Sequence, residues 1–131
     1  PPASDVAAGL EIVESLRRVE GDVWVPSHPY LAERAGKPNH AHELALTDVL
    51  RPVDSPQHAK LIASLREAIR ARRWQVVVLD HTGWLKDEVQ PFYEHRAQMF
   101  GTDEPDRFWP MTGYRTRPDF VWTAKVDSIA R

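Results

Sequence analysis

The chain has 131 residues, of which 17 are basic and 19 acidic, for a formal net charge of -2, and it contains no cysteine. The length fits one domain, and the balanced charge lacks the concentrated cationic surface that nucleic-acid binding requires, so no nucleic-acid partner is expected. The lack of cysteine excludes disulfides, thiolate nucleophiles and cysteine-ligated zinc. Because the sequence begins at Pro1 rather than Met, we expect residues 1–131 to be one domain cut from a longer protein.

The first predicted elements are an amphipathic helix and a short strand. The apolar positions at helical spacing in residues 5–19 are Val6, Leu10, Val13 and Leu16. Gly21 ends this helix, and DVWVP at residues 22–26 is typical of a short buried strand that stops at its proline. This strand places Ser27 and His28 at its carboxyl end.

The stretch HPYLAERAGKPNHAH, residues 28–42, holds three of the six histidines. Residues 30–35 fit either a helical turn or a short strand, and a turn is expected at residues 36–39. His40 and His42 share a face only on an extended backbone; with His28 and Glu43 nearby, they are weak candidates for a divalent metal site. Solvated loop histidines are the favoured interpretation, so no metal is assigned.

A second helix and a buried strand follow. Ser55 is a capping residue and Pro56 fits the first helical position. The apolar face of this helix comprises Leu61, Ile62, Leu65, Ala68 and Ile69. The strand WQVVVLD, residues 74–80, is continuously aliphatic at its centre, which indicates burial on both faces in a central position of a parallel sheet. Its longest aliphatic run, residues 76–79, is far shorter than the roughly 20 residues of a membrane span.

The last third of the chain predicts one more helix and one more strand. A third helical stripe comprises Leu85, Val89, Phe92, Tyr93, Arg96 and Phe100. Pro91 predicts that the regular helix begins near Gln90. Residues 120–125 alternate in polarity, as a half-exposed edge strand does. The strand and helix order predicts an α/β fold: a small three-layer Rossmann-like sandwich with a mostly parallel sheet and a C-terminal edge strand.

Ligands of parallel sheets bind outside the carboxyl ends of the strands, and polar residues mark two such ends here. The candidate binding residues are His28, Tyr30, Asp80, His81, Trp84 and Tyr114. If the two strands are neighbours, His28, Asp80 and His81 line one crevice suited to acid–base or metal chemistry. The favoured interpretation is that these side chains cap loops and satisfy backbone donors. A further alternative is that Trp84, Trp109 or Tyr114 stacks on a sugar. No G-x-S-x-G, G-x-G-x-x-G or Walker motif is present, so no serine nucleophile and no nucleotide or other cofactor is expected.

Four segments taken together resemble a known family. These are PSHPYLAERAGKP after a strand, the following helix, the strand WQVVVLD, and GYRTRP at residues 113–118 before a last strand. They resemble the C-terminal soluble region of bacterial multi-spanning membrane glycosyltransferase-like proteins, of the polyprenyl-phosphate-sugar-dependent mannosyltransferase and arabinosyltransferase type. The resemblance spans residues 21–125, nearly the whole chain.

The resemblance implies a non-catalytic domain on the extracytoplasmic face of a bacterial cell membrane. In that family the catalytic acid lies between early membrane helices, which this chain lacks, so no catalytic residue is carried over. The implied partners are the membrane portion of the parent chain and a glycan or lipid-linked sugar. The residues leave two alternatives open: a small independent enzyme that uses His28, Asp80 and His81, with or without metal, and a carbohydrate-binding domain.

Overall fold

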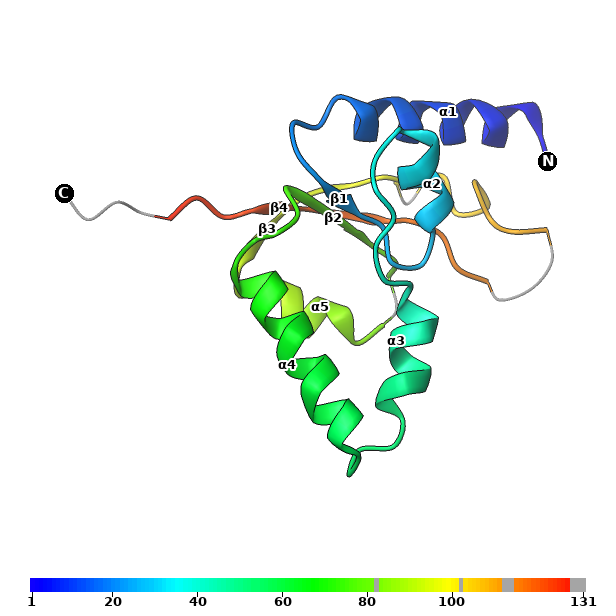
Figure 1. Ribbon diagram of the computed structural model, residues 1–131. Coiled ribbons are helices and arrows are strands. Elements are labelled where there is room, and N and C mark those ends of the chain that lie inside the picture. Colours follow the sequence, from blue (N-terminus) through cyan, green and yellow to red (C-terminus); the bar gives the residue numbers. More distant parts are fainter. Residues whose placement is uncertain (82, 102, 112–114, 128–131) are drawn as a thin grey trace.

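The computed structural model describes residues 1–81, 83–101, 103–111 and 115–127. Within these residues, five helices flank an open four-stranded sheet, which confirms the predicted α/β class (Figure 1). The elements in chain order are α1 Ala3–Arg17, β1 Val23–Trp24, α2 Pro29–Arg34, α3 Glu43–Leu50, α4 Pro56–Arg70, β2 Val76–Leu79, α5 Leu85–Val89, β3 Tyr93–Gln98 and β4 Phe120–Ala124.

The sheet has the strand order β1-β2-β4-β3, with one parallel and two antiparallel pairs. β1 runs parallel to β2, with Val23 opposite Val76, whereas β4 runs antiparallel to both of its neighbours. The prediction of a mostly parallel, Rossmann-like sheet is therefore wrong. All four residues of β2 are buried and the strand lies inside the sheet, as predicted, but burial on both faces does not determine the direction of the neighbouring strands.

β4 lies inside the sheet rather than at its edge, which corrects a second prediction. Phe120 at the start of β4 pairs with Leu79 on one side and with Gln98 on the other. Of its five residues only Trp122 is buried, so the strand has the mixed exposure that is typical of an edge strand. The edge positions belong to β1 and β3, because a strand's place in a sheet depends on distant hydrogen-bond partners that its own sequence pattern does not specify.

The prediction of a regular helix that begins near Gln90 is wrong, because only the residues before Gln90 are helical. The helix α5 ends at Val89, and Tyr93–Gln98 forms the edge strand β3. Pro91 lacks the amide hydrogen that an uninterrupted helix needs, and the ladder with β4 supplies partners for the residues beyond it. Only Tyr93 of β3 is buried, so the apolar spacing that suggested a helix did not reflect a buried helical face.

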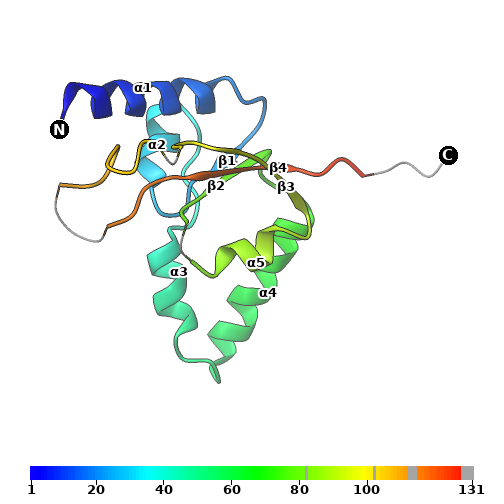
Figure 2. The ribbon, with the colours of Figure 1, turned by 180° about the vertical axis from the view of Figure 1, so that it is seen from behind.

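The helices cover both faces of the sheet. Figures 1 and 2 show α1 and α2 on one side and α3, α4 and α5 on the other. Two core clusters match these layers: Val23, Val25, Val76 and Val78 pack toward α1 and α2, and Trp24, Val77, Leu79 and Trp122 pack toward α3, α4 and α5. No helix in the described residues is both long enough and apolar enough to cross a membrane.

The helix α4 begins as the sequence predicts. The hydroxyl of Ser55 accepts a hydrogen bond from the amide of His58 at 3.0 Å, and Pro56 occupies the first turn. Leu65 and Ile69 are the buried residues of its apolar face. Local capping rules therefore suffice to position this helix along the chain.

The prediction for α1 is correct for Val13 and Leu16, which are buried, and wrong for Val6 and Leu10. Its buried residues are Ala8, Ile12, Val13 and Leu16. Val6 and Leu10, which the spacing assigned to the same stripe as Val13, are 49% and 61% exposed. An apolar stripe of α1 therefore remains uncovered by the sheet.

Two stacked tryptophans lie in the core below the sheet. The rings of Trp24 on β1 and Trp74 before β2 are 4.4 Å apart and 24° from parallel. Trp24 is only 1% exposed, and its Nε1 donates a hydrogen bond to the carbonyl oxygen of Ala41 at 2.8 Å. Trp24 thus links the edge strand, the neighbouring strand and the segment that leads into α3.

Candidate functional site

The carboxyl ends of the two parallel strands bring His28 and Asp80 together. Nε2 of His28 lies 3.0 Å from Oδ1 and 3.3 Å from Oδ2 of Asp80. The two residues are 8% and 7% exposed. The pairing of β1 with β2 explains this contact, since parallel neighbours end at the same edge of a sheet.

The contact with Asp80 determines what the rest of the His28 ring can do. When Nε2 carries the hydrogen and donates it to Asp80, Nδ1 is an acceptor. In the described part of the chain, Nδ1 of His28 has no hydrogen-bond partner, and His28 lines an open cavity. The geometry therefore offers an oriented acceptor, or a base, to a molecule in that cavity.

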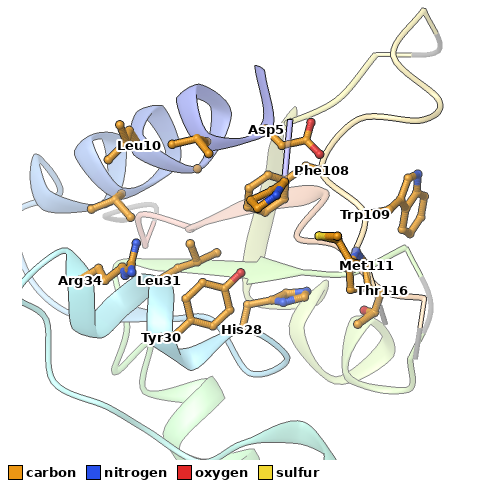
Figure 3. A pocket seen from close by; sticks show the side chains of 15 residues that line it. Asp5, Leu10, His28, Tyr30, Leu31, Arg34, Phe108, Trp109, Met111 and Thr116 are labelled. Carbon is orange, nitrogen blue, oxygen red and sulfur yellow. The ribbon is translucent and has the colours of Figure 1, made fainter. Parts of the chain in front are cut away.

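Tyr30, from the first turn of α2, lies beside His28. The two rings meet edge to face with centroids 6.2 Å apart. Burial raises the pKa of Tyr30 above its ordinary value of 10; nearby Arg34 lowers it and the charge of Asp80 raises it. The phenol therefore keeps its proton at neutral pH and acts as a hydrogen-bond donor. In Figure 3 its hydroxyl points into the space between α2 and Phe108.

The cavity has a volume of about 470 Å³ and lies between α1, α2 and the segment before β4 (Figure 3). Its apolar wall consists of Val6, Leu10, Val13, Leu31, Phe108 and Met111. Its polar lining includes His28 and Tyr30, with Arg34 and Asp5 as charged groups of opposite sign. A mostly apolar hollow with a few convergent polar groups is the usual form of a small-molecule site.

The wall formed by residues 103–111 is held against α1 by specific contacts. A Cβ atom at position 9 would lie 3.1 Å from Cε2 of Phe108, so the glycine permits the Phe108 ring to approach α1 closely. The guanidinium carbon of buried Arg117 lies 4.5 Å from the ring centroid of Trp109 and 4.6 Å from that of Phe100. Arg117 also donates hydrogen bonds to the carbonyl oxygens of Glu104 and Arg107. Arg117 thereby fixes the segment that closes one side of the cavity.

Ser27 and Glu43 form a second polar contact next to the buried pair. The Ser27 hydroxyl donates to Oε2 of Glu43 at 2.6 Å, and the Glu43 amide donates to the carbonyl oxygen of Pro26 at 2.9 Å. Gly83 makes room for this carboxylate, because a Cβ there would lie 2.5 Å from its Oε1. The hydroxyl of Ser27 is therefore engaged by Glu43.

Glu43 carries a perturbed carboxyl group. Burial raises its pKa above the ordinary value of 4.5; the Ser27 hydrogen bond lowers it, Asp80 raises it, and His42 and His28 lower it. A raised pKa in the folded state means that ionisation of Glu43 costs stability. This cost is absent below pH 4.5, grows as the pH rises through the raised pKa, and is constant above it.

We therefore expect Glu43→Gln to stabilise the protein at pH 7 by a few tenths to about 1 kcal/mol. The amide oxygen of glutamine still accepts the Ser27 hydrogen bond, so only the charge is removed. Urea unfolding at pH 7 and at pH 4 measures the difference, which should shrink at the lower pH. The exposed Glu20→Gln serves as the control with little change. A Glu43→Gln protein that is less stable at pH 7 would show that the charged form stabilises the fold.

The other predicted binding residues do not join this pair in the described structure. The rings of His81 and Trp109 lie edge to face, with their centroids 5.9 Å apart. Nε1 of Trp84 donates to the hydroxyl of Thr47 at 3.1 Å, and its ring packs against the core cluster below the sheet. Tyr114 lies outside the described residues. The structure thus brings His28, Tyr30 and Asp80 together and assigns Trp84 a packing role.

His40 and His42 each have a local partner. Nε2 of His40 lies 3.6 Å from Oδ2 of Asp22, and burial lowers the pKa of His40, against the raising effect of Asp22. Nδ1 of His42 accepts a hydrogen bond from the amide of Leu44 at 3.1 Å and so caps α3. Among the described residues, no three histidine or acidic side chains are grouped so that they could hold a metal ion.

Sequence reasoning missed much of the cavity wall. Arg34 had a usable signal, because it lies four residues after Tyr30 and one helical turn places both on the same face. Phe108 and Met111 had no such signal, since they belong to a segment without regular structure.

Comparison with family models, with curated proteins and with solved structures found no match for this chain.

Proposed function

We propose that this chain is a non-catalytic binding domain that holds a hydroxylated ligand in the cavity between α1 and α2. The observation that carries the proposal is the buried His28–Asp80 pair, whose histidine lines that cavity. Asp80 fixes the orientation of the imidazole, as a carboxylate does for many functional histidines.

The polar groups suit an alcohol. Nδ1 of His28 accepts the hydrogen of a ligand hydroxyl, and the phenol of Tyr30 donates to the oxygen of the same or an adjacent hydroxyl. The apolar wall excludes water from these hydrogen bonds and covers the carbon face of the ligand. A volume of about 470 Å³ falls within the range of small-molecule sites.

The sequence resemblance suggests where such a domain acts. We propose that it belongs to a glycosyltransferase-like integral membrane protein and lies on the extracytoplasmic face of a bacterial membrane. There it would contact the membrane portion of the parent chain and shape access of a glycan acceptor or a lipid-linked sugar. The chemistry of transfer would belong to the membrane portion.

The same pair supports a second candidate, an independent enzyme. In that case Nδ1 of His28 takes a proton from a bound hydroxyl and Asp80 stabilises the resulting imidazolium. The specific observation in its favour is that the histidine and its orienting carboxylate are buried and hydrogen-bonded beside an open cavity.

Titration of the domain with glucose, mannose and arabinose, followed by its histidine NMR signals, tests the proposal. We expect saturable shifts at His28 and a several-fold, up to about tenfold, weaker affinity in His28→Gln. Glutamine can still donate to Asp80 but removes the acceptor at the Nδ1 position. His95→Gln, the same change on the exposed strand β3, is the matched control and should bind like the parent.

Two other results would contradict the proposal in different ways. If no sugar perturbs His28 at any concentration, the cavity does not bind this class of ligand. If the purified domain converts a sugar and His28→Gln abolishes the conversion with the fold intact, the second candidate, an enzyme, is correct.

A further inference from the structure

An apolar rim surrounds the mouth of the cavity. Eight large hydrophobic residues are exposed in the described part of the chain, and four of them line this cavity: Val6, Leu10, Tyr30 and Met111. Leu10 and Met111 are 61% and 79% exposed. Apolar side chains gathered at one opening indicate an apolar partner, whereas scattered ones would need no explanation.

The rim continues along α1 as a track. Val6, Leu10 and Val13 succeed one another at intervals of four and three residues, which places them on one face of the helix. They span about 10 Å of helix axis, at about 1.5 Å per residue. Val13 is buried while Val6 and Leu10 are exposed, so the track leads from the interior of the cavity to its surface.

Charges on the cavity wall do not favour an ionic headgroup. Arg34 and Asp5 line the cavity with opposite charges, and the carboxylate of Asp80 is taken up by His28. The groups beside the paired carboxylate are the phenol of Tyr30 and the ring nitrogen of His28, both able to bind a neutral hydroxyl.

We propose that the cavity binds a single amphiphile, with an uncharged hydroxylated headgroup at His28 and Tyr30 and an alkyl chain along Val6 and Leu10. This inference rests on the proposed function and extends it from the headgroup to the tail. The polar residues select the head, and the apolar track of α1 adds affinity in proportion to the length of chain that it covers.

Isothermal titration of the domain with octyl β-D-glucoside, below the concentration at which it forms micelles, tests the proposal against glucose and against octanoate. We expect octyl glucoside to bind at least about tenfold more tightly than glucose, because a buried alkyl chain adds to the headgroup's hydrogen bonds. Leu10→Ser should weaken the binding of octyl glucoside much more than the binding of glucose, and so remove most of this difference. Leu44→Ser, at a similarly exposed leucine on α3, is the matched control and should change neither affinity.

The outcomes separate the inference from the function on which it rests. Equal affinity for glucose and octyl glucoside, or equal effects of Leu10→Ser and Leu44→Ser, would overturn the amphiphile and leave the hydroxyl site in place. Tighter binding of octanoate would overturn the uncharged headgroup. Binding that begins only when micelles form would mean attachment to an assembled lipid surface and would also overturn the proposal. If neither glucose nor octyl glucoside binds, both the inference and the proposed function fail.

Discussion

Replacement of Trp24 by alanine should lower the free energy of unfolding by about 3–5 kcal/mol. Trp24 is 1% exposed, stacks on Trp74 at 4.4 Å and donates a hydrogen bond to the carbonyl oxygen of Ala41. The substitution leaves a cavity under β1 and an unpaired carbonyl. A small domain has a total stability of about 5–15 kcal/mol, so the variant should lose a substantial share of it. Urea or thermal unfolding followed by circular dichroism measures the loss.

The matched control is Trp109→Ala, at the rim of the cavity. Trp109 is partly exposed and its main contacts are the guanidinium groups of Arg115 and Arg117, so we expect a loss below about 2 kcal/mol. If both variants lose the same stability, the stacked pair is not the strongest part of the core, and the segment before β4 contributes as much as the sheet.

Replacement of Asp80 by alanine should affect stability and ligand binding together. The change leaves Nε2 of His28 buried without an acceptor, which costs about 1–3 kcal/mol. It also removes the group that orients the ring, so affinity for a hydroxylated ligand should fall at least as far as in His28→Gln. Asp80→Asn keeps an acceptor oxygen at this position and should recover part of the stability. Unfolding curves and the NMR signals of His28 measure the two effects.

The chain contains a more exposed histidine–aspartate pair that serves as the comparison. Asp22 lies 3.6 Å from His40 and its side chain is 39% exposed, so Asp22→Ala should cost less than about 1 kcal/mol and leave the cavity unchanged. An Asp80→Ala protein as stable as Asp22→Ala would show that water replaces the lost acceptor and that the pair is not closed to solvent.

The parts of the fold that the sequence predicts are those with local causes. The cap at Ser55 and the aliphatic residues of β2 determine α4 and an interior strand without reference to the rest of the chain. β3 has no such cause: five of its six residues are exposed, and it is a strand because β4 pairs with it. The position of β4 likewise depends on two partners, one of which lies more than 40 residues earlier in the chain.

The candidate site likewise has parts with local causes and parts that depend on contacts between distant residues. The sequence places His28 and Asp80 at strand ends, and only the pairing of β1 with β2 brings them into contact. The apolar wall could not be predicted, because Phe108 and Met111 reach α1 through tertiary contacts. Leu10 was assigned to the buried stripe of α1, since helical spacing shows which residues share a face and not whether the sheet covers it.

The position of β4 also has a consequence for biosynthesis. β4 is the last strand in the described residues, yet it lies between β2 and β3 and pairs with both. Until residues 120–124 have left the ribosome, the aliphatic strand β2 has one side without a partner and β3 has no ladder at all. Between the synthesis of β2 and that of β4, the nascent chain therefore carries an open, apolar strand edge, the type of edge to which other chains add strands. The sheet is completed only when residues 120–124 have emerged, and β4 then closes the edge that would otherwise promote aggregation.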